Sequence, residues 1–157
     1  MTDLNHLAPG TPTNDGTNPS MPAALHYLRM FTDDAGKSAL APAVLDRFAL
    51  QTLGGAAAEM WMKRLPGAPQ EVWFTVLPVG WTGDWHESPG PQWVTALSGR
   101  WWIETADGQR VEMGPGEIHW GEDQGTTSER GHRSGQIGDV PCVQLMVRYD
   151  SAPDLTA

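Results

Sequence analysis

The stretch Gly80 to Gly99, "GWTGDWHESPGPQWVTALSG", places a histidine among turn-forming residues and then runs into an apolar segment that ends at a glycine. Five residues separate Gly80 from His86, and six separate Gln92 from Gly99. Pro89 and Pro91 bend the chain between His86 and Gln92, so the two side chains need not share one continuous strand. We expect both to point into the interior of a closed β-structure.

Segments on either side of this stretch alternate apolar and polar residues with a period of two, which is typical of half-buried strands. The clearest examples are residues 72–77, 110–113 and 143–149. "ADGQ" at 106–109 predicts a hairpin turn. Short strands about ten residues apart favour a β-sandwich or barrel. Residues 36–53 are the one segment where we expect a helical turn or two, interrupted by Pro42.

The spacing around His86 resembles the first motif of the cupin family, which runs glycine, five residues, His-x-His, three or four residues, Glu, six residues, glycine. Gly80, His86 and Gly99 match that motif, whereas Ser88 stands at the second histidine and Gln92 at the glutamate. The resemblance therefore covers the spacing and only one of the three ligand identities.

The second cupin motif opens on a glycine, passes through a Pro-Gly-Asp turn and ends in a histidine. Gly108, "MGPGE" at 113–117 and His132 resemble it, with Glu117 in the Asp place and a longer segment before the histidine. The resemblance spans about residues 70–149 and implies an all-β fold of the cupin jelly-roll barrel type. It implies no single reaction.

By this resemblance His86, Gln92 and His132 form the metal site, with a divalent transition metal (Fe, Mn, Ni or Zn) as cofactor. Gln92 adds a neutral amide oxygen where the family has a carboxylate, so the ion's charge is left uncompensated. The competing interpretation is that the metal has been lost. For each residue an ordinary role also stays open: a surface histidine, a glutamine bonded to backbone, or a histidine at a loop edge.

Four further side chains are candidates for acid–base chemistry. Glu122 and Asp123 are adjacent, so at most one of them enters the cavity if they lie on a strand, where it would act as base or orient a histidine. Glu104 is a candidate if it points inward. His119 is a candidate proton carrier or extra ligand, although a buried structural histidine is the commoner case.

Eight tryptophans are present among 157 residues. We expect Trp81, Trp85, Trp102 and Trp120 to line a flat apolar pocket for substrate, with core packing as the alternative for each. The remaining tryptophans near the motifs, Trp101 among them, are expected to pack in the core or in a dimer contact.

The composition limits the classes of partner that the protein is expected to bind. The formal net charge is −9, which disfavours nucleic acid and anionic membranes. Cys142 is the single cysteine, and the start of the chain resembles no signal peptide, so we expect a cytoplasmic protein.

Residues 1–20 predict a flexible tail, and residues 21–150 predict a single cupin domain. Apolar strand faces such as that of residues 72–78 predict a homodimer.

These observations predict a metal-assisted lyase, isomerase or oxygenase that acts on a small anionic or ring-shaped metabolite. Two alternatives stay open: a metal-free acid–base enzyme of the epimerase or cyclase kind, and a barrel that binds a small molecule without changing it. Chelation and ligand-binding experiments discriminate among the three.

Overall fold

The computed structural model describes residues 12–13, 24–127 and 130–156 and is all-β, with no helix in those ranges. The predicted all-β class is therefore confirmed. The strands are β1 (Pro12–Thr13), β2 (Ala24–Thr32), β3 (Ser38–Leu45), β4 (Ala49–Gln51), β5 (Met60–Met62), β6 (Pro69–Leu77), β7 (Gln92–Ser98), β8 (Arg100–Thr105), β9 (Arg110–Met113), β10 (Ile118–Glu122), β11 (His132–Ile137) and β12 (Cys142–Tyr149).

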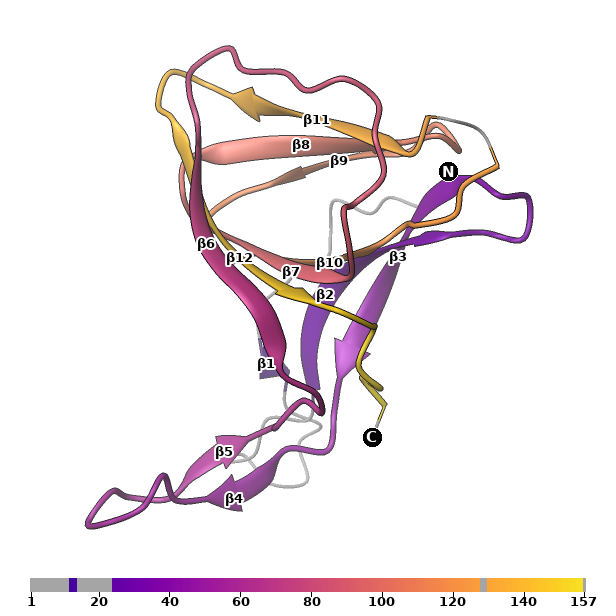
Figure 1. The fold of residues 1–157 in the computed structure, drawn as a ribbon. Coiled ribbons are helices and arrows are strands. Elements are labelled where there is room, and N and C mark those ends of the chain that lie inside the picture. The colour runs from indigo at the N-terminus through magenta and orange to yellow at the C-terminus, as the bar shows by residue number, and fades with distance from the viewer. Residues whose placement is uncertain (1–11, 14–23, 128–129, 157) are drawn as a thin grey trace.

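Two sheets form the body of the molecule (Figure 1). The larger sheet has the order β1-β2-β10-β7-β12-β6, with β3 also paired to β2, and the smaller has the order β11-β8-β9. All strand pairs are antiparallel except β10 with β2, which is parallel. The β4–β5 hairpin pairs only with itself and projects away from the two sheets (Figure 1).

The principal core lies between the two sheets, because each contributes its inward-facing apolar residues to one cluster. The larger sheet supplies Leu28, Met30, Leu40, Leu77, Val94, Ala96 and Cys142, and the smaller sheet supplies Trp101, Ile103, Val111 and Met113. A second cluster of buried aromatic residues contains Tyr27, Trp93, Trp120 and Tyr149 together with Leu45. Burial of these side chains is the main driving force that holds the sheets together.

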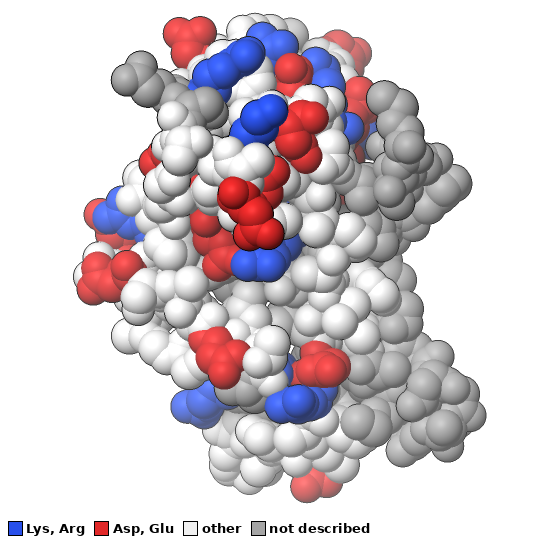
Figure 2. Space-filling model, turned by 90° about the vertical axis from the view of Figure 1, so that its right-hand side faces the viewer, with Lys and Arg blue, Asp and Glu red and all other residues white. Residues whose placement is uncertain are grey.

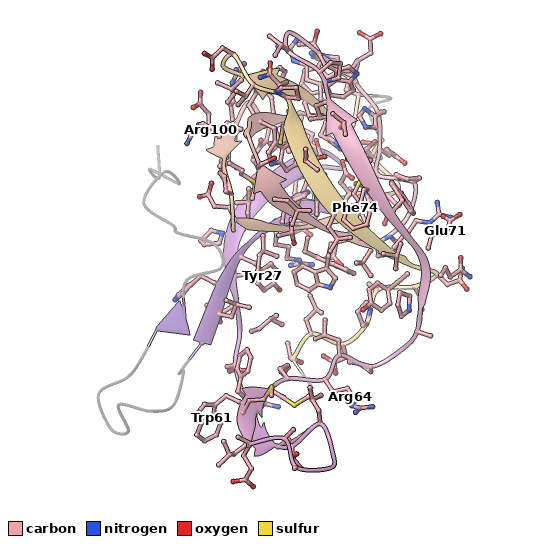
Figure 3. All side chains as sticks on the ribbon, turned by 90° about the vertical axis from the view of Figure 1, so that its left-hand side faces the viewer. Tyr27, Trp61, Arg64, Glu71, Phe74 and Arg100 are labelled. Carbon is pink, nitrogen blue, oxygen red and sulfur yellow. The ribbon has the colours of Figure 1, made fainter. Side chains whose placement is uncertain are left out.

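Strand β6 forms an edge of the larger sheet and shows the predicted alternation. Leu77 is buried and Thr75 half-buried on the inner face, whereas Val72, Phe74 and Val76 are exposed on the outer face. Figure 3 looks onto this strand and shows Phe74 on it. An unpaired strand edge with an apolar outer face is typical of a surface that another chain covers.

Residues 36–53 are extended rather than helical, since β3 and β4 occupy most of this segment. Pro42 lies on β3, which pairs with β2 alone, and an edge strand tolerates a residue that has no N–H to donate.

The predicted flexible tail, residues 1–20, falls outside the described residues apart from β1. No helix in the described ranges is long and apolar enough to cross a membrane. On the face shown in Figure 2, acidic and basic side chains lie next to one another.

Candidate functional site

A cavity of about 230 Å³ opens between the two sheets. Its apolar walls are Leu77, Trp81, Val94, Trp101, Ile103 and Met146. Three histidines line it, each from a different segment: His86 from the β6–β7 loop, His119 from β10 and His132 from β11. Gln92, at the start of β7, lines it as well. The three residues assigned to the metal site by sequence therefore border one space.

His86 and His132 are held side by side by their backbones. The two residues form an isolated antiparallel bridge in which each N–H donates to the other's carbonyl oxygen at 2.8 Å. Their ring centroids are 4.4 Å apart. Gly131 permits this approach: its φ is +52°, and an added Cβ would lie 2.2 Å from the carbonyl oxygen of His86. A larger residue at position 131 would push the loop away from β11.

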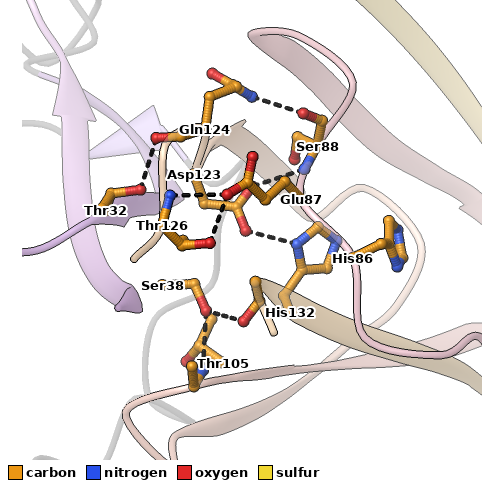
Figure 4. Close-up of polar contacts among 12 residues, drawn as sticks. Thr32, Ser38, His86, Glu87, Ser88, Thr105, Asp123, Gln124, Thr126 and His132 are labelled. Carbon is orange, nitrogen blue, oxygen red and sulfur yellow. Dashed lines mark hydrogen bonds and ion pairs between the residues drawn. The ribbon is translucent and has the colours of Figure 1, made fainter. Parts of the chain in front are cut away.

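Asp123 fixes the ring of His132. The ring nitrogen Nδ1 of His132 lies 2.7 Å from Asp123 Oδ2, and the backbone N–H of Ser88 donates to Oδ1 at 2.9 Å (Figure 4). Burial acts to raise the pKa of Asp123, but the hydrogen bond and positive charge of His132, with the bonds from Ser88, hold it below its ordinary value. An ionised carboxylate accepts only, so Nδ1 of His132 carries a proton, and in the neutral ring the lone pair is therefore on Nε2.

The ring of His86 has the same tautomer for a different reason. Its Nδ1 lies 2.7 Å from the carbonyl oxygen of Asp84, which can only accept. In their neutral forms the rings of His86 and His132 thus both have an unprotonated Nε2. His132 is buried, and His86 is exposed at the mouth of the cavity.

The loop that carries His86 is tied to the segment that carries Asp123. Glu87 accepts hydrogen bonds from the backbone N–H groups of Gly125 (3.3 Å) and Thr126 (2.7 Å) and from the Thr126 hydroxyl. The hydroxyl bond is the main cause that lowers the pKa of Glu87. Gln124 Nε2 also donates to the carbonyl oxygen of Ser88 at 3.0 Å (Figure 4). These contacts fix the distance between the two histidines and the carboxylate.

His119 is almost completely buried, with 2% of its surface exposed, and the edge of its ring meets Trp101 at a centroid distance of 5.9 Å. Burial, together with the positive charge of His132, lowers its pKa to about 3. His119 is therefore neutral at physiological pH. It is a wall residue of the cavity rather than a proton carrier in that pH range.

The two glutamates predicted as acid–base groups do not line the cavity. Glu122 forms an ion pair with Arg29 at 2.5 Å. Glu104 accepts from Arg133 at 3.0 Å and lies 3.8 Å from Arg110. Each carboxylate is thus engaged by arginine outside the site. Asp123, the neighbour of Glu122, is the acid that contacts a histidine, although it does not itself line the cavity.

The tryptophans predicted to bind substrate lie in different places. Trp81 lines the cavity, as does Trp101, which the sequence assigned to packing. Trp85 and Trp102 are covered by arginine guanidinium groups at 4.4 and 4.0 Å from their ring centroids and do not line it. Trp120 is fully buried in the second cluster. The aromatic wall of the cavity is therefore formed by Trp81 and Trp101.

Ser134 on β11 is one polar residue of the wall that sequence reasoning missed, and Thr75 on β6 and Gln144 on β12 are two others. Thr75 and Gln144 are direct partners across the strand pair, and the Thr75 hydroxyl donates to Gln144 Oε1 at 3.1 Å. Gln144 is 4% exposed, and its Nε2 has no hydrogen-bond partner. The available signal was a glutamine between Val143 and Leu145 in an otherwise apolar strand.

The donor set fits a resident metal ion poorly. Two imidazoles and the Gln92 amide oxygen are acceptable ligands for a late first-row ion, but the one carboxylate nearby, Asp123, is committed to His132 and Ser88. In the described part of the chain, no group of three or more His, Cys, Asp or Glu residues is placed to hold a metal. The arrangement lacks the negative charge that would balance a divalent ion.

No known protein family and no curated protein matches the chain. Among solved structures it is similar to protein NMB1881 from Neisseria meningitidis, at 18% identity and a TM-score of 0.40, over 60% of this chain and 90% of that one. It is also similar to the capsular polysaccharide assembling protein CapF from Staphylococcus aureus, at 15% identity and a TM-score of 0.38. That match covers 64% of this chain but 30% of CapF. These similarities assign neither a family nor an activity.

Proposed function

We propose that the protein is a small-molecule enzyme that catalyses proton transfer, of the epimerase, isomerase or lyase kind, with His132 as general base. The observation that carries the proposal is the buried contact of 2.7 Å between His132 Nδ1 and Asp123, on a ring that lines a cavity. A carboxylate that accepts from Nδ1 orients the imidazole and stabilises the imidazolium that forms when Nε2 takes a proton.

In the proposed step, Nε2 of His132 removes a proton from a carbon next to a substrate carbonyl group. The electron pair of that C–H bond moves into the substrate and places negative charge on the carbonyl oxygen. N–H groups of the wall stabilise this charge by hydrogen bonds. Return of the proton to another face or atom gives the isomer, and His86, with its ring 4.4 Å away, is the second group placed to carry a proton.

The metal-assisted reaction predicted from the cupin resemblance is the alternative. It requires His86, Gln92 and His132 to hold a divalent ion, and the donor set described above gives it less support than proton transfer. Elemental analysis of protein purified without an affinity tag, followed by activity after treatment with a chelator, separates the two. Activity that survives chelation favours the histidine–aspartate pair.

The proposed proton transfer is tested in D₂O. The protein is incubated with a metabolite extract, and ¹H NMR records which α-protons are replaced by deuterium. We expect exchange in at least one compound, lowered about 10²- to 10⁴-fold by His132→Gln, since general base catalysis contributes that much. Asp123→Asn lowers exchange as well, because the amide no longer stabilises the imidazolium.

Glu122→Gln is the matched control, since Glu122 neighbours Asp123 in sequence but pairs with Arg29 outside the cavity. It leaves the exchange rate unchanged. If no compound exchanges, or if His132→Gln exchanges as fast as the native protein, the catalytic proposal is wrong.

A further inference from the structure

The described side chains that line the cavity include no lysine, arginine, aspartate or glutamate. The nearest carboxylate, Asp123, is turned to His132 and to the Ser88 N–H, and the arginines Arg29 and Arg133 are paired with Glu122 and Glu104. A ligand that carried a full charge into this space would lose its hydration and meet no lysine, arginine, aspartate or glutamate side chain there.

The wall does contain buried polar atoms without partners. Nε1 of Trp101, Nε2 of Gln144 and Oε1 of Gln92 all lack a hydrogen bond, as do Ser88 Oγ and His119 Nδ1, and all five side chains are at least nine-tenths buried. Buried polar groups are usually satisfied, so each such group calls for an explanation. An indole N–H can only donate, so Trp101 in particular requires an acceptor.

The orientation of Gln144 is set by a neighbour. Its Oε1 accepts from the Thr75 hydroxyl, which leaves the N–H₂ group as the unpartnered end. Gln144 and Trp101 therefore offer donors, and Gln92 offers an acceptor. Leu77, Val94 and Met146 supply apolar surface around them.

We infer that the ligand of this cavity is a small neutral molecule that carries both a carbonyl or hydroxyl oxygen and an N–H or O–H group, as in an amide, a lactam or a hydroxyketone. Its oxygen accepts from Trp101 and Gln144, and its N–H or O–H donates to Gln92. The cavity of about 230 Å³ has the volume of roughly eight water molecules at about 30 Å³ each, which limits the ligand to a compact molecule. The sequence-based expectation of an anionic metabolite is revised accordingly.

This inference builds on the proposed function in that the ligand occupies the cavity where His132 acts, but it is tested by binding alone. The probes are matched pairs that share a skeleton and differ in charge: lactamide with lactate, glycerol with glycerate, and pyroglutamide with pyroglutamate. Saturation-transfer NMR detects binding at pH 8, and calorimetric titration measures the affinity. We expect the neutral member to bind at least tenfold more tightly in each pair that binds.

Two variants test the assigned contacts. Trp101→Phe removes the N–H and keeps an aromatic ring, and Gln144→Leu removes the amide at similar volume. Each is expected to weaken binding of the neutral probe about tenfold. Circular dichroism and the melting temperature establish that each variant is folded, and Trp102→Phe, at a tryptophan outside the cavity, is the control that leaves affinity unchanged.

The inference is overturned if the anionic member binds as tightly as the neutral one, if no probe of any pair binds, or if both folded variants bind as well as the native protein. Binding of neutral probes without any proton exchange would support the inference and refute the proposed catalysis. Proton exchange restricted to anionic compounds would support the proposed catalysis and refute the inference of a neutral ligand.

Discussion

Two buried glutamines, Gln144 and Gln136, differ in the number of hydrogen bonds that their side-chain amides form. This difference predicts that replacement by leucine changes the free energy of unfolding differently at the two positions. Gln136 is 8% exposed and fully bonded: Oε1 accepts from the Gly80 N–H at 2.8 Å, and Nε2 lies 2.7 Å from the carbonyl oxygens of both Ile137 and Val140. Gln144 has one bond, from Thr75, and an unpartnered Nε2.

The difference in stability follows from the number of bonds. Replacement of Gln136 by leucine breaks about three hydrogen bonds at about 1 kcal/mol each, so the free energy of unfolding falls by about 3 kcal/mol. Replacement of Gln144 by leucine breaks one bond but also removes a buried amide that costs about 1–3 kcal/mol. The ligand-free Gln144→Leu protein is therefore expected to be as stable as the native protein or about 1 kcal/mol more stable.

Urea titration monitored by tryptophan fluorescence, in the absence of ligand, measures both free energies of unfolding. The expected gap between the variants is about 3–4 kcal/mol. If Gln144→Leu is destabilised as much as Gln136→Leu, the amide of Gln144 has a structural partner, and the argument that it waits for a ligand is refuted. A gain in stability together with a loss of binding would be a trade-off typical of a functional site.

Three further predictions concern pH, the histidine bridge and the exposed strand. Because the pKa of His119 falls from 6.5 unfolded to about 3 folded, protonation favours the unfolded chain, and the free energy of unfolding decreases as the pH falls from 6.5 toward 3. The loss is about 2 kcal/mol at pH 5. In urea titrations His119→Gln should lose this pH dependence, whereas a variant that keeps it contradicts the assignment. Gly131→Ala should lower the free energy of unfolding by about 2–4 kcal/mol in the same urea titration. Gly138→Ala should lower it by about 1 kcal/mol, because φ there is +87° but an added Cβ meets no atom within 4 Å. Equal losses at the two positions would refute the argument that the close approach of His86 requires glycine at position 131. Phe74, 69% exposed on the edge strand, predicts a homodimer that Phe74→Lys converts to a monomer in light scattering, and a native monomer would refute it.

The strands were predictable from sequence where alternation is strict. In β6 and β9 the period of two identifies both the strand and its two faces, since apolar side chains recur at every second position. In β12 the pattern identifies the strand but not its inner face. Val143, Leu145 and Val147 look like core residues, yet Gln144 is the side chain that lines the cavity. The three apolar residues are instead the cross-strand partners of Val76, Phe74 and Val72, the exposed outer face of β6.

The site was predictable only in part. The cupin-like spacing indicated His86, Gln92 and His132, and the fold places all three on one cavity. The sequence does not show which of Glu122 and Asp123 turns inward, since that depends on where β10 ends relative to β11. The partners of Trp85 and Trp102 could not be inferred either, because the arginines that cover them lie elsewhere in the chain.

The central claim is that Asp123 holds His132 as the tautomer protonated on Nδ1, with its Nε2 lone pair free for a substrate proton. Long-range ¹H–¹⁵N NMR of the protein labelled with [¹⁵N]histidine measures this directly. We predict that neutral His132 carries its proton on Nδ1 in the native protein and loses that preference in Asp123→Leu. A His132 ring protonated on Nε2, or one that averages between tautomers as free histidine does, would contradict the account.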